Sequence, residues 1–441
     1  MSGQGDARRR DGRPGGPQNR PQGRSHGQRG SQQAGGQPRG RRGDEPRGPQ
    51  RTVQPARRVA YDVLRAVSES DAYANLILPS AIAEAGLGPQ DAALATELAY
   101  GTLRRRGTYD AIIASAADRP AEEIDPAVLD ALRLATHQLL ATRVASHAAV
   151  NESVNLVAST QGRGASSFAN AVLRRIARET PGEWEDRIES SARSDDERLA
   201  LRSAHPVWVI RALRRALAAE GRADELDDLL DADNASPEVT LVALPGLADP
   251  GEPRRPYAPT AFGSPGGDPH RVIAATGGTV RVQDEGSQLV ALALAAAAPI
   301  TSGERWLDLC AGPGGKTALL AAIAREHDVT LEANEVIPTR ARLVRNALRA
   351  VPGEVVVHEE DGRSFGASHP GAFDRILVDA PCTGLGALRR RPEARWRKTP
   401  ADVAELVPLQ VELLSSALHA LAPGGIVAYV TCSPHLAETT G

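Results

Sequence analysis

The chain has 441 residues, more than one usual domain, and its hydrophobic content of 41% is enough to bury substantial cores. Its three cysteines are odd in number and far apart, which argues against a disulfide framework and indicates a reducing interior. The start, MSGQGDARRR, has no apolar signal core, and the longest nearly apolar run has about 12 residues where a membrane span needs roughly 20. We therefore expect a cytoplasmic protein without a membrane segment.

The first segment, residues 1–50, contains Gly, Pro, Gln and Arg but no Val, Ile or Leu. Such a composition cannot bury enough apolar surface to offset the entropy of ordering, so it predicts a disordered arm. Eleven arginines against four acids give the arm a charge of +7, although the whole chain has a net charge of -3. The arm suits loose phosphate contacts, and a solubilising tail explains it equally well.

Residues 51–180 predict an all-α bundle. Apolar side chains recur at helical spacing in ARRVAYDVLRAV and again in PAVLDALRLATHQLLATRVA. Gly162 and Gly164 are expected to break two later helices apart. Leucine stripes of this kind are usually core, so we assign no functional residue inside the bundle.

The remaining chain predicts a bridging region at 181–275 and an α/β domain at 276–441. The bridging region begins with charged helical sequence and includes a strand in SPEVTLVAL. After it, strands and helices alternate, which indicates a doubly wound parallel sheet with helices on both faces. The expected strands are 279–283, 305–310, 329–335, 375–380 and 426–432, and the expected helices are 287–298, 317–326, 340–350 and 411–421. Ligands in this architecture bind beyond the carboxyl ends of the strands.

The first chemical motif is LDLCAGPGGKT, Leu307 to Thr317, which follows a strand and begins a helix. A Walker A loop is disfavoured, because Cys310 stands where its first glycine is required. A dinucleotide fingerprint is also weak, because Thr317 stands at its last glycine. The third candidate ligand is S-adenosylmethionine, whose sites combine such a loop with an acid at the end of the second strand. Glu335 lies twenty residues after Gly315, where that acid is expected.

Two further motifs carry thiols. DAPCTG places Asp379 and Cys382 after one expected strand, and VTCSP places Cys432 after the next. A cysteine after a buried strand is often simple packing, so Cys382 alone indicates little. Because neighbouring parallel strands end at the same edge of a sheet, the two cysteines, fifty residues apart, could share one pocket with the glycine-rich loop.

These motifs, in this order, resemble the RsmB (Sun/Fmu) family of RNA cytosine-5 methyltransferases. The helical segments ALRLATHQLL, HAAVNESVNLV and FANAVLRRIA resemble the RNA-binding NusB-type bundle that precedes the catalytic domain in that family, and VRVQDEGSQLVA resembles the segment that leads into the domain. The resemblance covers nearly the whole chain after residue 50. It implies an S-adenosylmethionine-dependent enzyme that methylates carbon 5 of a cytosine in small-subunit (16S) ribosomal RNA.

The resemblance also implies roles for individual residues. Cys432 would be the nucleophile that adds to carbon 6 of the cytosine, and Cys382 would assist proton removal and product release. Asp379 would bond the N3 edge of the base, and Lys316, one of only two lysines, would contact the base as a fixed cation. The implied cofactor-binding residues are Cys310, Ala311, Gly312, Pro313, Gly314, Gly315, Lys316, Glu335, Asp361 and Asp379, with Arg340 as a further candidate.

The segment RRRPEARWRK, residues 389–398, combines a run of cations with one aromatic, Trp396. Such a run is usually a solvated charged face, but its position next to the thiol loop favours a surface that binds the RNA backbone and stacks on a base. Family members continue past the TCS motif, so we expect a chain truncated after its fifth strand, with that strand exposed at the sheet edge.

Two other functions compete with an RNA methyltransferase. One is a catalytically silent RNA-binding factor that acts through the bundle and the arginine-rich arm; intact thiols and an intact cofactor loop argue against it. The other is a DNA cytosine methyltransferase, whose nucleophile would lie in the Pro-Cys segment and which would have no helical bundle. We expect ribosomal RNA as the partner, no metal, and a monomer.

Overall fold

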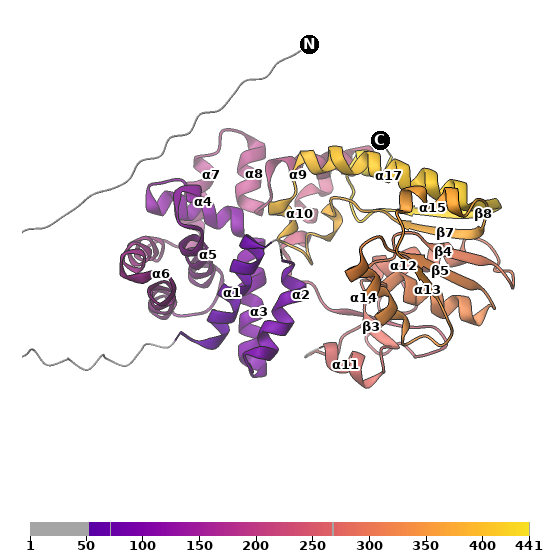
Figure 1. Ribbon diagram of the computed structural model, residues 1–441. Helices are drawn as coiled ribbons and strands as arrows, with labels where there is room; N and C mark the ends of the chain where they lie inside the picture. The colour runs from indigo at the N-terminus through magenta and orange to yellow at the C-terminus, as the bar shows by residue number, and fades with distance from the viewer. Residues whose placement is uncertain (1–52, 71, 267–268, 441) are drawn as a thin grey trace, which may run out of the picture. The chain divides into compact units, whose positions relative to one another are not determined.

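A computed structural model describes residues 53–70, 72–266 and 269–440 of the chain. The arm predicted for residues 1–50 lies outside the described residues. Figure 1 shows that an all-helical part is followed along the chain by a part built on a parallel sheet. This order agrees with the fold class expected from the sequence.

The helical part is a bundle whose helices follow the predicted apolar stripes. Its helices are α1 (Pro55–Glu69), α2 (Ala74–Glu84), α3 (Pro89–Arg104), α4 (Arg106–Ala117), α5 (Pro126–Ala141) and α6 (Ser146–Ile176). Asp125 caps α5, where its side chain accepts hydrogen bonds from the backbone N–H groups of Ala127 and Val128. Helix α6 is interrupted at Gly162, which has a φ of 87°, so the predicted break lies at this glycine.

Four more helices follow, and the first belongs to the bundle core. They are α7 (Pro181–Ser190), α8 (Asp195–Ser203), α9 (Val207–Ala219) and α10 (Leu226–Asn234). Thr180 and Glu183 form a capping box at the start of α7. Trp184 of α7 is fully buried among the bundle side chains, and its indole donates a hydrogen bond to the Ile176 carbonyl. The predicted bridging region therefore begins as an extension of the bundle.

A small antiparallel sheet completes the bridging region. Its strands are β1 (Thr240–Ala243), β2 (Ala261–Gly263) and β3 (Val280–Val282), in the order β2-β1-β3, and α11 (Pro269–Ala275) precedes β3. The strands expected in SPEVTLVAL and at 279–283 are both present. They pair with each other, so the strand at 279–283 does not join the large sheet as expected.

The second part contains a five-stranded parallel sheet in the order β6-β5-β4-β7-β8. The strands are β4 (Arg305–Asp308), β5 (Thr330–Asn334), β6 (Val356–His358), β7 (Phe373–Asp379) and β8 (Leu421–Val430). The helices are α12 (Glu285–Ala296), α13 (Gly315–Glu326), α14 (Pro338–Leu348), α15 (Gly362–Ser368), α16 (Ala394–Arg397) and α17 (Pro400–Ala420). The sequence did not predict β6, which has only three residues.

Helices cover both faces of the parallel sheet, as expected for a doubly wound fold (Figure 1). Alternate strand residues face opposite sides: Trp306 and Leu377 pack with α12, α13 and α14, whereas Leu307 and Ile376 pack with α15 and α17. β7 and β8, predicted as neighbours, pair in parallel. Their carboxyl ends therefore meet at one edge, together with those of β4 and β5.

Candidate active site

The glycine-rich loop connects β4 to α13 at the carboxyl edge of the sheet. Gly314 precedes α13 with a φ of 100°, and a Cβ atom there would lie 2.8 Å from the Cα atom of Val344. No other residue would fit that position without strain. The Ala311 N–H donates to the Asn334 carbonyl (2.9 Å), which ties the loop to the end of β5.

Glu335, the acid expected after the second strand, contacts the loop directly. It is only 4% exposed, and its Oε2 atom accepts a hydrogen bond from the Gly312 N–H at 3.1 Å. A Cβ atom on Gly312 would lie 2.1 Å from the same oxygen, so only glycine allows this contact. Arg340 donates to the Gly312 carbonyl at 2.8 Å and lies 3.5 Å from the Glu335 carboxylate. The structure thus brings these three predicted residues together.

Two polar residues that sequence reasoning missed hold this loop at the ends of β4 and β5. Asp308, at the end of β4, is fully buried and accepts a hydrogen bond from the Thr317 hydroxyl at 2.7 Å. Burial raises the pKa of Asp308 to about 7. The Asn334 side chain donates to the carbonyls of Leu309 and Glu360, and so joins the ends of three strands. The sequence did contain a signal for Asp308 and Asn334, because each is a polar residue at the end of a buried strand.

Lys316 and Asp379 form an ion pair beside the loop. The Lys316 Nζ atom lies 2.7 Å from Asp379 Oδ2, and both side chains are mostly buried, with exposures of 16% and 28%. Lys316 comes from the first turn of α13, and Asp379 is the last residue of β7. The two residues predicted to contact the base are therefore adjacent to each other.

Cys382 and Cys432 lie in contact where β7 and β8 end. Their Sγ atoms are 3.4 Å apart, and Cys432 is the exposed member of the pair. The hydrogen bond with Cys382 lowers the pKa of Cys432 to about 7, and the positive charges of Arg391 and Lys316 act in the same direction. The same hydrogen bond, together with burial, raises the pKa of Cys382 above its ordinary value. Cys432 is thus the better thiolate, and Cys382 the donor.

Cys310 has a different environment from the two paired thiols. Burial, followed by the nearby carboxylates Asp308, Asp379 and Glu335, raises its pKa well above the ordinary value for a thiol. A thiol that stays protonated in this way is poorly suited to act as a nucleophile. Pro313, in the same loop, is exposed.

Asp361 stands apart from the residues above. It follows β6, is exposed, and caps α15 by accepting a hydrogen bond from the Arg363 N–H at 3.0 Å. The Arg363 guanidinium also binds it, which lowers the pKa of Asp361. Its contacts are those of a helix cap, and its implied role in cofactor binding stays a prediction.

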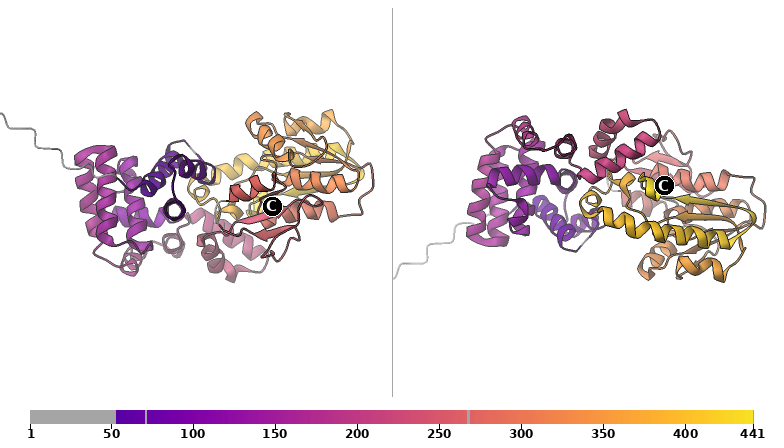
Figure 2. Two further views of the ribbon diagram at one scale, coloured as in Figure 1. Left: turned by 90° about the horizontal axis from the view of Figure 1, so that it is seen from below. Right: turned by 90° about the horizontal axis from the view of Figure 1, so that it is seen from above.

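The basic segment 389–398 requires a correction, because much of it faces the bundle instead of solvent. Arg395 is fully buried. The Trp396 indole donates to the Leu103 carbonyl at 2.8 Å, and its ring packs on Gly107. Arg397 donates to the carbonyls of Val67 and Ala72. Figure 2 shows this segment, just before α17, next to the indigo helices from two further sides. The prediction that Trp396 stacks on RNA is therefore wrong.

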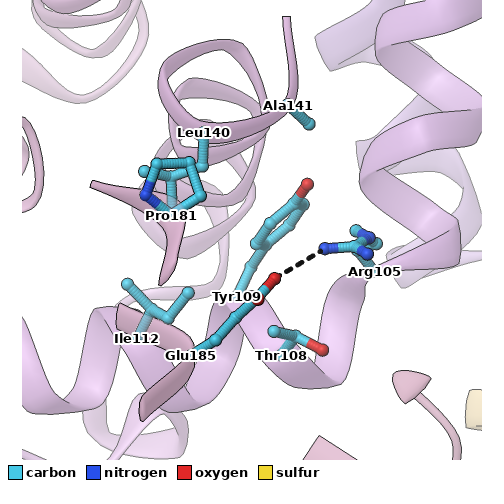
Figure 3. A pocket seen from close by; sticks show the side chains of 8 residues that line it. All are labelled: Arg105, Thr108, Tyr109, Ile112, Leu140, Ala141, Pro181 and Glu185. Atoms are coloured by element: carbon cyan, nitrogen blue, oxygen red, sulfur yellow. Dashed lines mark ion pairs between the residues drawn. The ribbon is translucent and has the colours of Figure 1, made fainter. Parts of the chain in front are cut away.

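A pocket within the bundle has no connection to these residues. Figure 3 shows its lining from α4, α5 and α7, with Arg105 and Glu185 forming an ion pair at 3.7 Å. No residue predicted for the site lines this pocket. The carboxyl edge of the parallel sheet is therefore the candidate site.

In residues 53–70, 72–266 and 269–440, no group of three or more His, Cys, Asp or Glu side chains is arranged to hold a metal ion. Within those ranges, no helix is both long and apolar enough to cross a membrane.

Comparisons with known proteins match both parts of the chain. The family model described as 16S rRNA methyltransferase RsmB/F matches residues 295–441, and the NusB family model matches residues 54–178. A protein of Mycobacterium tuberculosis named as a methyltransferase is 50% identical over 404 residues, covering 90% of this chain and 87% of that protein. The probable ribosomal RNA small subunit methyltransferase B of Bacillus subtilis is 32% identical over 393 residues, covering 86% of this chain and 84% of that protein.

A solved structure supports the fold. The crystal structure of PH0851 superposes with a TM-score of 0.74 at 22% identity and covers 88% of each chain. Sequence identity, coverage and the two family models agree with the motifs and with the arrangement of the sheet. The chain belongs to the RsmB/F family of 16S rRNA methyltransferases, with a NusB domain before the methyltransferase domain.

Proposed function

We propose that this protein transfers a methyl group from S-adenosylmethionine to carbon 5 of a cytosine in small-subunit ribosomal RNA. Family membership supports RNA methylation, and the relatives named as ribosomal RNA small subunit methyltransferase B support the substrate. The observation that carries the cytosine chemistry is the contact between Cys382 and Cys432 beside the Lys316–Asp379 pair.

The glycine-rich loop fits the cofactor. The glycines at 312 and 314 leave backbone space that a Cβ atom would fill, and the N-terminal end of α13 offers free N–H groups. Residues Cys310 to Lys316 would line the cofactor, Glu335 would accept hydrogen bonds from its ribose, and Asp361 would lie toward its adenine. When bound, S-adenosylmethionine supplies an activated methyl group.

Cys432 is suited to begin the reaction because half of it is thiolate near neutral pH if its pKa is about 7. Carbon 5 of cytosine is a poor nucleophile, so a bond between Cys432 Sγ and carbon 6 must first push an electron pair onto carbon 5. As this charge develops, N3 would take a proton from solvent and the Asp379 carboxylate would accept a hydrogen bond from that N3–H, while Lys316 would hold the base as a fixed cation. Carbon 5 then takes the methyl group.

Release of the methylated base requires an electron pair to return to the bond between carbons 5 and 6. The hydrogen bond between the two thiols indicates how Cys382 takes part. Before the reaction, the hydrogen bond to Cys432 raises the pKa of Cys382. Once the Cys432 sulfur is bonded to carbon 6, this cause disappears, and Cys382 can release its proton to solvent more easily. It would then take the carbon 5 proton, and the electron pair of that C–H bond would restore the ring and expel Cys432.

The RNA must present the target base outside a helical stack, because carbon 6 is not accessible within one. The NusB domain would supply RNA affinity in addition to the site. The expectations of a cytoplasmic location and a monomer stay predictions.

The test is transfer of a labelled methyl group by the full chain to small-subunit rRNA, with large-subunit rRNA as the control substrate. Digestion to nucleosides should place the label in 5-methylcytidine, and Cys432→Ala should abolish transfer without loss of cofactor binding. Label in another nucleoside would contradict the cytosine assignment. RNA binding without transfer by the parent chain would favour the RNA-binding factor.

A further inference from the structure

The residues next to the two thiols are held by a buried carboxylate that none of the predicted roles uses. Glu438 is 1% exposed and ends a short helical turn, Leu436–Glu438, that follows Cys432 in the chain. Its Oε1 atom accepts a hydrogen bond from the Thr383 N–H at 2.8 Å. Its Oε2 atom accepts a hydrogen bond from the Thr383 hydroxyl. Thr383 directly follows Cys382.

The same network reaches the residue that follows the second thiol. The Thr383 hydroxyl oxygen lies 3.0 Å from the Ser433 hydroxyl oxygen, and both side chains are buried. Ser433 directly follows Cys432. Glu438 therefore connects, through Thr383, the two backbone positions that follow Cys382 and Cys432.

A third contact fixes the other side of Cys382. Gln410 of α17 donates to the carbonyl of Pro381, the residue before Cys382, at 2.9 Å. Its amide also lies within hydrogen-bond distance of Glu438 Oε1, at 3.3 Å. Because the backbone on both sides of Cys382 is bonded to this pair of side chains, the sulfur has little freedom to move.

The chemistry of this network argues for more than packing. A buried carboxylate is costly unless hydrogen bonds compensate for its lost hydration, and an apolar side chain would fill the same space at no such cost. The donors that Glu438 uses belong to Thr383, which follows Cys382, and to Gln410 of α17, and Thr383 in turn contacts Ser433, which follows Cys432. Fully satisfied buried networks of this kind rigidify the groups that they join.

We propose that Glu438 is a positioning residue that holds Cys382 and Cys432 at contact distance. This inference rests on the proposed function, which gives the two thiols their separate tasks. Without the carboxylate, the Cys382 loop can move away from Cys432, and the Cys432 thiolate loses the donor that stabilises it.

The measurement is the rate at which iodoacetamide alkylates Cys432 in the full chain, followed by peptide mass spectrometry from pH 6 to pH 10. Loss of the donor should move the inflection of this profile from about 7 toward the ordinary thiol value of about 8.5. In Glu438→Ala, alkylation at pH 7 should fall by roughly tenfold relative to the parent, while the rates converge near pH 10. A residue that only stabilises the fold would give the opposite, because loosening makes the already exposed Cys432 more accessible and speeds alkylation at every pH.

Two milder variants keep the test informative if Glu438→Ala does not fold. Glu438→Gln retains the side-chain shape and one oxygen that accepts hydrogen bonds, so the inflection of its alkylation profile should move less than in the alanine variant. Thr383→Val keeps the backbone N–H but removes the link to Ser433, and should also move the inflection upward. Glu405→Gln, an exposed acid on α17, is the matched control and should leave the profile unchanged.

Unchanged inflections in both Glu438→Gln and Thr383→Val would overturn the proposal, as would faster alkylation at all pH values. Alkylation requires neither RNA nor cofactor, so the result is independent of the methyl-transfer test. A shifted inflection in a protein that transfers no methyl group would leave the positioning role standing and reject only the proposed function.

Discussion

Replacement of Arg395 tests whether segment 389–398 packs against the helical bundle or binds RNA. Arg395 is fully buried between the two parts of the chain, and replacement by methionine keeps most of its apolar stem while removing every donor. The guanidinium donates to four acceptors: Arg104 O at 3.3 Å, Ala204 O at 3.0 Å, Asp233 O at 3.2 Å and Asn234 Oδ1 at 2.9 Å.

The expected loss follows from these four acceptors. Each buried acceptor left without a donor costs about 1 to 3 kcal/mol. Part of this cost is offset, because burial of the guanidinium is itself unfavourable, as shown by the lowering of the Arg395 pKa to about 10. The group is still charged at pH 7.5. We therefore expect Arg395→Met to lower the free energy of unfolding by about 3 to 5 kcal/mol.

The assay is urea unfolding at pH 7.5, with Arg391→Met as the control. Arg391 lies in the same segment but is exposed, so its replacement should change the free energy of unfolding by no more than about 0.5 kcal/mol. RNA affinity should be measured in parallel at several salt concentrations. Because Arg395 cannot reach a phosphate, its loss should leave the salt dependence unchanged. A stable Arg395→Met protein whose salt dependence decreased by about one phosphate contact would refute this reasoning.

Three further changes test other parts of the structure. Since the Asp308 pKa is raised to about 7, the free energy of unfolding should fall by up to about 4 kcal/mol as the pH rises from 4 to 7. Asp308→Asn should remove this fall. Unfolding curves with the same pH dependence in both proteins would contradict this. Glu335→Gln should weaken binding of S-adenosylmethionine by about 10- to 100-fold in calorimetry, and an unchanged Kd would exclude Glu335 as a cofactor contact. Gly107→Val would place a Cβ atom 2.4 Å from the Trp396 ring and should lower the free energy of unfolding by about 1 to 3 kcal/mol. Gly164→Ala is the control, because a Cβ atom there would lie in open space, and it should leave the free energy of unfolding unchanged. Equal effects of the two changes would argue against the packing of Trp396 on Gly107.

The sequence predicts the thiol pair well because the pairing depends on topology. Cys382 and Cys432 each follow a buried strand, and neighbouring parallel strands end at one edge, so alternation of strands and helices was enough to bring them together. The contact of Glu335 with the glycine-rich loop has the same origin. The short strand β6 was not predicted, because three partly exposed residues give no clear alternation.

Other features depend on long-range packing that no local pattern records. The cations of segment 389–398 have a composition that suits phosphates and backbone carbonyls equally, and only the fold shows that Arg395 and Trp396 bind carbonyls of the bundle and its extension. Glu438 gave no signal either, because a single acid in a loop is usually solvated. Its role depends on Thr383, which is 55 residues away in the chain.

The central claim is that Cys432 forms the bond to cytosine while Cys382 is needed to break it. The most direct measurement is a search for a covalent protein–RNA adduct in Cys382→Ala, incubated with S-adenosylmethionine and small-subunit rRNA and then denatured. We expect an adduct that mass spectrometry maps to Cys432, and no adduct when Cys432→Ala is added to the same variant. An adduct that forms without Cys432, or none in any variant despite methyl transfer by the parent, would contradict the assignment.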